Sequence, residues 1–164
     1  MFFESFWFEV ALIFLLIIAN GFFAASEIAI ISTRRTRIDA LREKGVRSAT
    51  AVARLKDDPD RFLATVQIGI TLVGTLASAI GGAAAIEFLK PSVQSLPLPG
   101  IGEWGESIAI MLVVLPIAYF TLVFGELLPK SLALRFSERI ASFVARPIYF
   151  FSRLTSFLVS ALTA

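Results

Sequence analysis

The chain has 164 residues and a formal net charge of +2; 57% of the residues are hydrophobic and 16 are Phe. Soluble globular chains are about 45–50% apolar, so this composition predicts a membrane protein. The sequence contains no Cys and no His, which excludes disulfides and thiolate metal sites and removes the commonest general base of enzymes. We therefore expect neither an enzyme nor a nucleic-acid-binding protein.

Three runs without a charged residue follow one another along the chain. They cover residues 10–26, 62–86 and 107–125. Each run is in the length range of about 17–25 residues that crosses a bilayer as a helix. A backbone in lipid must satisfy its own hydrogen bonds, which favours helices over single strands. The predicted fold class is an all-α integral membrane domain with three transmembrane helices.

The connection between the first two spans is strongly basic. It carries nine Lys or Arg residues between Ser32 and Arg61, whereas the connection between the second and third spans carries only Lys90. Basic loops remain on the cytoplasmic side of a membrane. We therefore predict a multi-pass protein of the cell inner or plasma membrane, with its N-terminus outside and its C-terminus in the cytoplasm.

The basic connection has the pattern of an amphipathic helical linker. Its apolar residues recur at helical spacing, with Arg and Lys between them: Ile38, Leu41, Ala49, Val52 and Leu55. Gly45 is expected to divide the linker into two short helices, which lie on the anionic lipids of the cytoplasmic leaflet. The acidic residues around Pro59 are expected to stop the second helix and to cap the second span.

After the third span, Pro147 is suited to begin a C-terminal juxtamembrane helix. We therefore divide the chain into a transmembrane domain, residues 1–146, and a juxtamembrane helix, residues 147–164. Arg153 interrupts the second segment, so we expect an interfacial helix and not a fourth span. An apolar helix that ends at Ala164 suggests that a longer protein continues beyond it.

Gly125, Glu126 and Pro129 at the end of the third span form a candidate cation site. Proline has no N–H, so the carbonyl four residues before it, that of Gly125, loses its helical donor. This carbonyl, the Glu126 carboxylate and a Ser or Thr hydroxyl from a neighbouring helix are hard oxygen ligands, which suit Mg²⁺ or Ca²⁺. Freed carbonyls in interrupted helices build cation sites in transporters.

Structural explanations exist for each of these polar residues. A buried Ser or Thr can donate to its own i−4 carbonyl. Glu27 can pair with Arg34 or Arg35, and Glu126 can pair with Lys130 at i+4. The glycines of the second span can serve close helix packing.

Three motifs in order, NGFFAASEIAI, TVQIGITLVGT and FGELLPK, resemble the transmembrane domain of the CorC/CNNM (cyclin M) family, in its hemolysin-like bacterial branch. The resemblance covers the chain from about Phe14 to Arg146. It implies a homodimer that exports Mg²⁺, with Na⁺ as the coupling ion. It also implies that a cytoplasmic pair of CBS domains, which binds ATP, follows in the full-length chain.

The resemblance also assigns the metal site residue by residue. It implies ligands in all three spans, at Ser26, Gln67, Gly69, Thr71, Gly125 and Glu126. Glu27 is a secondary acidic candidate outside this ligand set, which a polyamine or organic-cation exporter would use. Gly21, Gly69 and Pro129 are the expected hinge or kink positions.

The second span departs from the family pattern. Many members have Gly-Asn-Thr where this chain has Gly69, Ile70 and Thr71, and an Ile side chain cannot bind a cation. That ligand is therefore lost, or it is supplied by Gln67, Thr71 or a backbone carbonyl. Two alternatives to Mg²⁺ export remain open. One is export of polyamines or organic cations, and the other is a membrane anchor and dimeriser that senses ions without conducting them.

Overall fold

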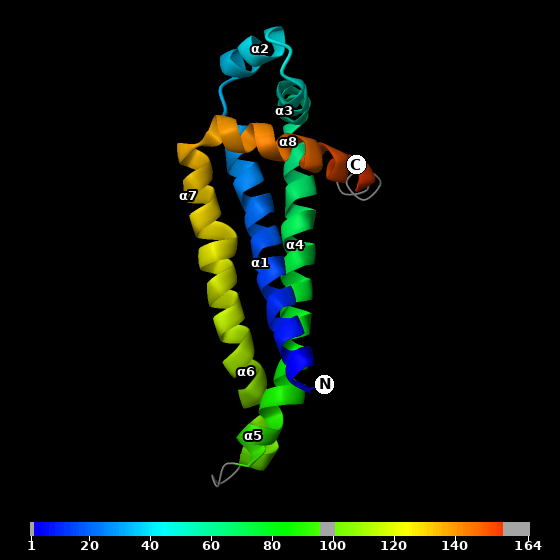
Figure 1. Cartoon of the computed structure of the whole chain (residues 1–164), viewed down its shortest axis with the longest axis vertical. Helices are drawn as coiled ribbons and strands as arrows, with labels where there is room; N and C mark the ends of the chain where they lie inside the picture. The colour runs from blue at the N-terminus through cyan, green and yellow to red at the C-terminus, as the bar shows by residue number, and fades with distance from the viewer. Residues whose placement is uncertain (1, 96–100, 156–164) are drawn as a thin grey trace.

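The computed structural model describes residues 2–95 and 101–155, with side chains at 6–95 and 104–155. Within these ranges the elements are all helices, and none is a strand. Three long helical stretches run side by side, and shorter helices gather at one end of them (Figure 1). We call this the basic end, because it carries the basic linker. The predicted all-α class is confirmed.

Three stretches are long and apolar enough to cross a membrane: Phe6–Ser32, Pro59–Gln94 and Trp104–Arg135. The first is α1 (Phe2–Ser32). The second joins α4 (Pro59–Ala84), the π-helical η1 (Ala85–Leu89) and α5 (Lys90–Gln94). The third joins α6 (Ile101–Leu122), the π-helical η2 (Val123–Leu127) and α7 (Leu128–Arg135). The prediction of three spans is confirmed.

Helix α1 lies between the other two spans towards the basic end (Figure 1). On one side it packs on α4, where Gly69 lies against the ring of Phe23. On the other side it packs on η2 and α7. The two candidate ligand groups of the second and third spans are therefore separated by the first span.

The linker consists of α2 (Arg35–Glu43) and α3 (Arg47–Asp57). Gly45, with a φ of 74°, is the break between them, because this left-handed conformation suits glycine. Asp58 caps α4, since its carboxylate accepts a 3.2 Å hydrogen bond from the Arg61 N–H. Both boundaries agree with the sequence prediction.

Helix α8 (Ser137–Leu154) lies across the basic end of the spans (Figure 1). It begins at Ser137 and not at Pro147, so the predicted start is wrong. The chain turns at Phe136, which leaves the helical conformation, and Pro147 lies in the interior of the helix on its exposed face. Of the predicted 147–164 segment, residues 156–164 lie outside the described residues.

The apolar face of the linker packs on protein and not on lipid. Ile38, Val52 and Leu55 are buried in one cluster with Val144 and Ile148 of α8. We expected this face to rest on the membrane surface. An amphipathic helix has the same sequence pattern on a membrane surface and on an apolar protein surface. Here α8 supplies the apolar surface.

Lys56 connects the linker to the end of the first span. Its ammonium donates a 3.0 Å hydrogen bond to the Ile31 carbonyl and another to the Thr33 carbonyl. Burial, and secondly the nearby Arg35 guanidinium, lower the pKa of Lys56 below its ordinary value of 10.5. The amino group of Lys56 provides donors to carbonyls at the C-terminal end of α1, where the helix itself supplies none.

At the opposite end, the second span continues further than its apolar run predicts. Helix α5 extends to Gln94, and Pro91 lies within the continuous second span, just after η1, where its missing N–H leaves the carbonyl four residues earlier without an α-helical donor. Lys90 and Glu106 form a 2.5 Å ion pair that joins α5 to α6. Pro97, Pro99 and Gly100, which suit a turn in this connection, lie outside the described residues.

Candidate functional site

The carbonyl of Gly125 has a side-chain partner in the first span. The Asn20 amide Nδ2 donates a buried 2.9 Å hydrogen bond to it. Pro129 cannot supply the α-helical N–H to this carbonyl, and Gly125 lies in the π-helical segment η2. Asn20 therefore takes the place of the missing backbone donor.

The other oxygen of Asn20 has no such partner. Asn20 is 3% exposed, and its Oδ1 is buried without a hydrogen bond from any described residue. The orientation of the amide is fixed, because a carbonyl can only accept. An unsatisfied buried oxygen costs about 1–3 kcal/mol, so Oδ1 is suited to receive a cation or a proton donor.

Two glycines allow the first and third spans to approach closely here. A Cβ on Gly21 would lie 3.0 Å from Pro129 Cγ and 3.2 Å from the Phe124 carbonyl oxygen. A Cβ on Gly125 would lie 3.2 Å from Asn20 Nδ2. The structure thus brings the predicted kink positions Gly21 and Pro129 together.

Glu126 points to a group of charges that we call the Lys130 cluster: Glu27, Glu126 and Lys130. The Lys130 ammonium lies 2.9 Å from Glu126 Oε1 and 3.5 Å from Glu27 Oε2. All three side chains are partly buried, between 28% and 42% exposed. Two carboxylates around one ammonium leave a net charge of −1.

Glu27 therefore pairs with Lys130 and not with Arg34 or Arg35.

Ser26 is fully buried, and its hydroxyl donates a 2.6 Å hydrogen bond to the Phe22 carbonyl, four residues earlier. This bond uses the only proton of the hydroxyl, so its oxygen remains able to accept or to bind a cation.

The second-span residues lie apart from this site. Gly69 is buried against Phe23. Gln67 and Thr71 are exposed on α4, where the Gln67 amide donates a 3.5 Å hydrogen bond to the Thr71 hydroxyl. Within this single chain, the structure brings Gly125 and Glu126 close to the first span, and it does not bring Gln67 or Thr71 to them.

Sequence reasoning did not include Asn20 in the site. The available signals were a lone Asn in an apolar span and a carbonyl freed by Pro129 in another. Pairing them needs the relative register of two helices, which the sequence does not supply. Among the described residues, no three Asp or Glu side chains gather as a metal cluster, so a cation here would rely largely on neutral oxygens.

These observations define a multi-pass α-helical membrane domain with polar groups between its first and third spans. The sequence matches the cyclin M transmembrane N-terminal domain (CNNM) over residues 11–164. The chain belongs to this CNNM family.

Its relatives are bacterial UPF0053 proteins. It is 41% identical over 159 residues to the UPF0053 protein sll0260 of Synechocystis, which is 97% of this chain and 35% of that protein. It is 35% identical over 140 residues to the UPF0053 protein YhdT of Bacillus subtilis, 85% of this chain and 30% of the relative. The UPF0053 inner membrane protein YfjD of Escherichia coli is 31% identical over 148 residues, 88% and 31% of the two chains. The chain thus spans about a third of the length of these relatives.

Proposed function

We propose that this domain transports a cation, exporting Mg²⁺ in exchange for Na⁺, through a site between the first and third spans. The observation that carries the proposal concerns the Asn20 side chain. Its Nδ2 donates to the Gly125 carbonyl, which lacks an α-helical donor, and its Oδ1 is buried without a hydrogen bond. The next residue after Gly125 is Glu126, which adds a carboxylate. Membership of the CNNM family and the all-oxygen chemistry support Mg²⁺ as the cargo.

In this proposal, the Lys130 ammonium and the cation compete for the Glu126 carboxylate. The ammonium neutralises Glu126 at 2.9 Å while remaining within 3.5 Å of Glu27. An arriving cation would bind Glu126, the Gly125 carbonyl and the Asn20 Oδ1, and Lys130 would then remain with Glu27. One carboxylate with neutral oxygens binds a divalent ion weakly enough to release it.

The orientation follows from the basic end. The linker and α8 carry most of the Lys and Arg residues, so we propose that this end faces the cytoplasm and that the N-terminus is outside. The Lys130 cluster then lies near the cytoplasmic ends of the spans, where a cytoplasmic ion would enter.

We propose that two copies pair through α4. Four exposed polar side chains are spaced three or four residues apart and therefore lie on one face of this helix: Gln67, Thr71, Thr75 and Ser78. Polar side chains at membrane depth face protein or water and not lipid. A second copy would bury this face and could add Gln67 and Thr71 to an ion path.

The pairing can be tested directly because the chain has no native Cys. A Thr75→Cys variant should form a disulfide-linked dimer in membranes, whereas Leu115→Cys, exposed on α6, should not. Equal cross-linking at both positions, or none at Thr75, contradicts an α4 interface.

Transport can be measured by Mg²⁺ flux in liposomes that contain the chain and a Mg²⁺ indicator dye. We expect flux for the wild type and for Glu87→Gln, which changes an exposed acid near the opposite end. Glu126→Gln should abolish flux while helix content and dimerisation persist. Normal flux in Glu126→Gln refutes the site, and Mg²⁺ binding without flux in the wild type favours the ion-sensing anchor.

One observation favours a polyamine as the alternative cargo. Glu27 and Glu126 already share a primary ammonium, that of Lys130, and a polyamine presents the same group. Stabilisation by spermidine but not by MgCl₂, lost in both Glu27→Gln and Glu126→Gln, would replace Mg²⁺ by an organic cation.

A further inference from the structure

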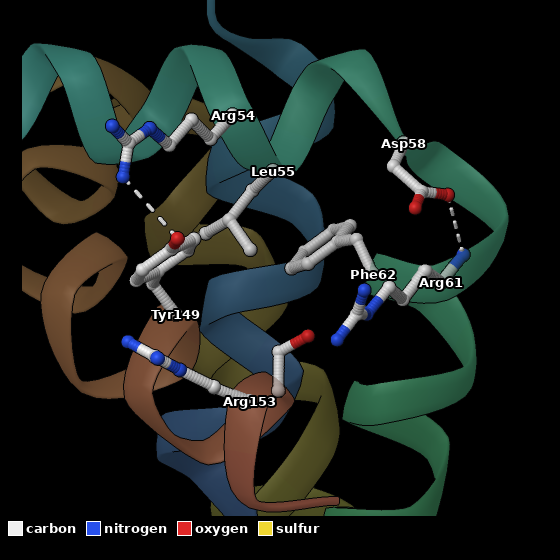
Figure 2. A pocket seen from close by; sticks show the side chains of 8 residues that line it. Arg54, Leu55, Asp58, Arg61, Phe62, Tyr149 and Arg153 are labelled. Atoms are coloured by element: carbon white, nitrogen blue, oxygen red, sulfur yellow. Dashed lines mark hydrogen bonds between the residues drawn. The ribbon is translucent and has the colours of Figure 1, made fainter. Parts of the chain in front are cut away.

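A pocket of about 290 Å³ opens at the basic end of the spans, apart from the proposed cation site. Three helices form it: α3, the first turns of α4, and the end of α8 (Figure 2). Its charged residues are Arg54, Arg61, Arg153 and Asp58, one or two from each helix. Tyr149, Ser152, Leu55 and Phe62 complete the lining.

The three guanidinium groups of this pocket are not neutralised. Other arginines of the linker, Arg35, Arg37 and Arg42, form ion pairs with acids. Arg54 instead donates a 3.2 Å hydrogen bond to the Tyr149 hydroxyl and lies 5.5 Å from the centre of its ring. Over the described ranges, neither Arg61 nor Arg153 has a carboxylate within ion-pair distance.

The one acid in the pocket already has a structural role. Asp58 accepts the Arg61 backbone N–H at 3.2 Å as the cap of α4 (Figure 2). Three positive charges and one negative charge leave a net charge of +2. Guanidinium groups suit phosphate oxygens, because they donate two parallel hydrogen bonds to them. The pocket therefore has the chemistry of a phosphate site.

The position of the pocket indicates where the phosphate comes from. Helix α8 lies across the ends of the spans (Figure 1) and exposes Phe143, Phe150 and Leu154 at 74%, 71% and 72%. Aromatic and aliphatic side chains exposed on a helix in this position insert at the boundary of headgroups and acyl chains. Arg153 lies directly before Leu154, so a helix inserted in this way would place the pocket at the level of the headgroup phosphates.

We propose that this pocket binds the phosphate of an anionic phospholipid in the leaflet at the basic end, with Arg61 and Arg153 as its main donors. Arg54 holds Tyr149 at the rim and adds positive charge. The bound lipid neutralises charges that α3, α4 and α8 bring together, so it stabilises the docking of the linker on the spans. Basic pockets of this kind at the cytoplasmic ends of membrane helices bind anionic headgroups.

The test uses the chain in nanodiscs of phosphatidylcholine alone or mixed with phosphatidylglycerol. Native mass spectrometry counts the phosphatidylglycerol retained, and thermal unfolding measures the stabilisation. The variants are Arg61→Gln and Arg153→Gln. The matched control is Arg146→Gln, which removes an exposed charge from α8 outside the pocket.

We expect phosphatidylglycerol to raise the unfolding temperature of the wild type and of Arg146→Gln. Each pocket variant should weaken lipid retention by about fivefold, since one basic residue near an anionic surface contributes about that factor. Arg153→Lys, which keeps the charge but loses the two-donor geometry, should lie between. Circular dichroism of each variant verifies that the helices are intact.

Three results would overturn the proposal. Equal loss of retention in Arg146→Gln and Arg153→Gln would indicate diffuse attraction to a basic surface. No preference for phosphatidylglycerol over phosphatidylcholine would exclude an anionic lipid site. Inorganic phosphate that stabilises the chain in pure phosphatidylcholine as much as phosphatidylglycerol does would assign the pocket to a soluble anion.

Discussion

Asn20 donates its side-chain amide to the carbonyl of Gly125 at 2.9 Å, across 105 residues of sequence. The bond joins the first span to the third at the position where Pro129 removes a backbone donor. It therefore serves helix packing, and it also defines a polar site in an apolar environment.

Replacing Asn20 by Ala should lower stability by about 1–2 kcal/mol, because the Gly125 carbonyl loses its donor in a buried place. It should also remove the stabilisation by Mg²⁺, since Oδ1 is a proposed ligand. Unfolding in detergent with and without MgCl₂ measures both effects. Leu115→Ala, at an exposed position of α6, is the control. Full Mg²⁺ stabilisation of Asn20→Ala contradicts the role of Oδ1.

Replacing Lys130 by Met should strengthen Mg²⁺ binding by about five- to tenfold, equivalent to about 1–1.4 kcal/mol. The ammonium 2.9 Å from Glu126 competes with the cation for the same carboxylate, and Met removes this competitor. Titration of Mg²⁺ against the melting temperature gives the affinity. Weaker binding in Lys130→Met would mean that the ammonium supports the site.

Gly69→Ala and Gly74→Ala form a matched pair on α4. A Cβ on Gly69 would lie 2.5 Å from the Phe23 ring, which is itself held against Phe151 at 5.2 Å. A Cβ on Gly74 meets nothing within 4 Å. We expect Gly69→Ala to cost about 1–3 kcal/mol of stability through overpacking.

Gly74→Ala should be neutral, or should stabilise by up to about 1 kcal/mol through helix propensity. Equilibrium unfolding of both variants under one condition compares the two positions. Similar effects of the two substitutions would show that α1 and α4 are not in close contact at Gly69.

The lowered pKa of Lys56 predicts a pH dependence in the alkaline range. Between that lowered pKa and the ordinary value of 10.5, the unfolded chain holds a proton that the folded chain has lost. Stability from this group therefore rises with pH across the window. Lys56→Met should have a smaller upward slope of stability against pH than wild type, whereas exposed Lys44→Met should keep it. An unchanged slope in Lys56→Met would show that a group other than Lys56 causes the pH dependence of stability.

Features set by local sequence were predictable. The three spans follow from the length of the uncharged runs, the linker break follows from Gly45, and the start of α4 follows from Asp58. Each depends on residues close in sequence, where hydrogen-bonding and solvation requirements act directly.

Features set by packing were not predictable. The start of α8 depends on the turn at Phe136. Pro147 lies within the helix, on its exposed face, although the preference of proline for the first turn predicts a helix start there. The partner of the Gly125 carbonyl depends on the register of α1 against η2. The surface beneath the linker could be lipid or protein, because both accept the same apolar face.

The buried core is concentrated at the basic end, where residues of α1, α2, α3, α4, α7 and α8 form one cluster. Only 17% of the most apolar window of the third span is buried in the chain. The three spans are therefore packed most tightly at the basic end, where Glu126 and Lys130 also lie. At the opposite end the Lys90–Glu106 ion pair joins the second span to the third. A change of tilt of the third span would have to break this ion pair or carry the second span with it.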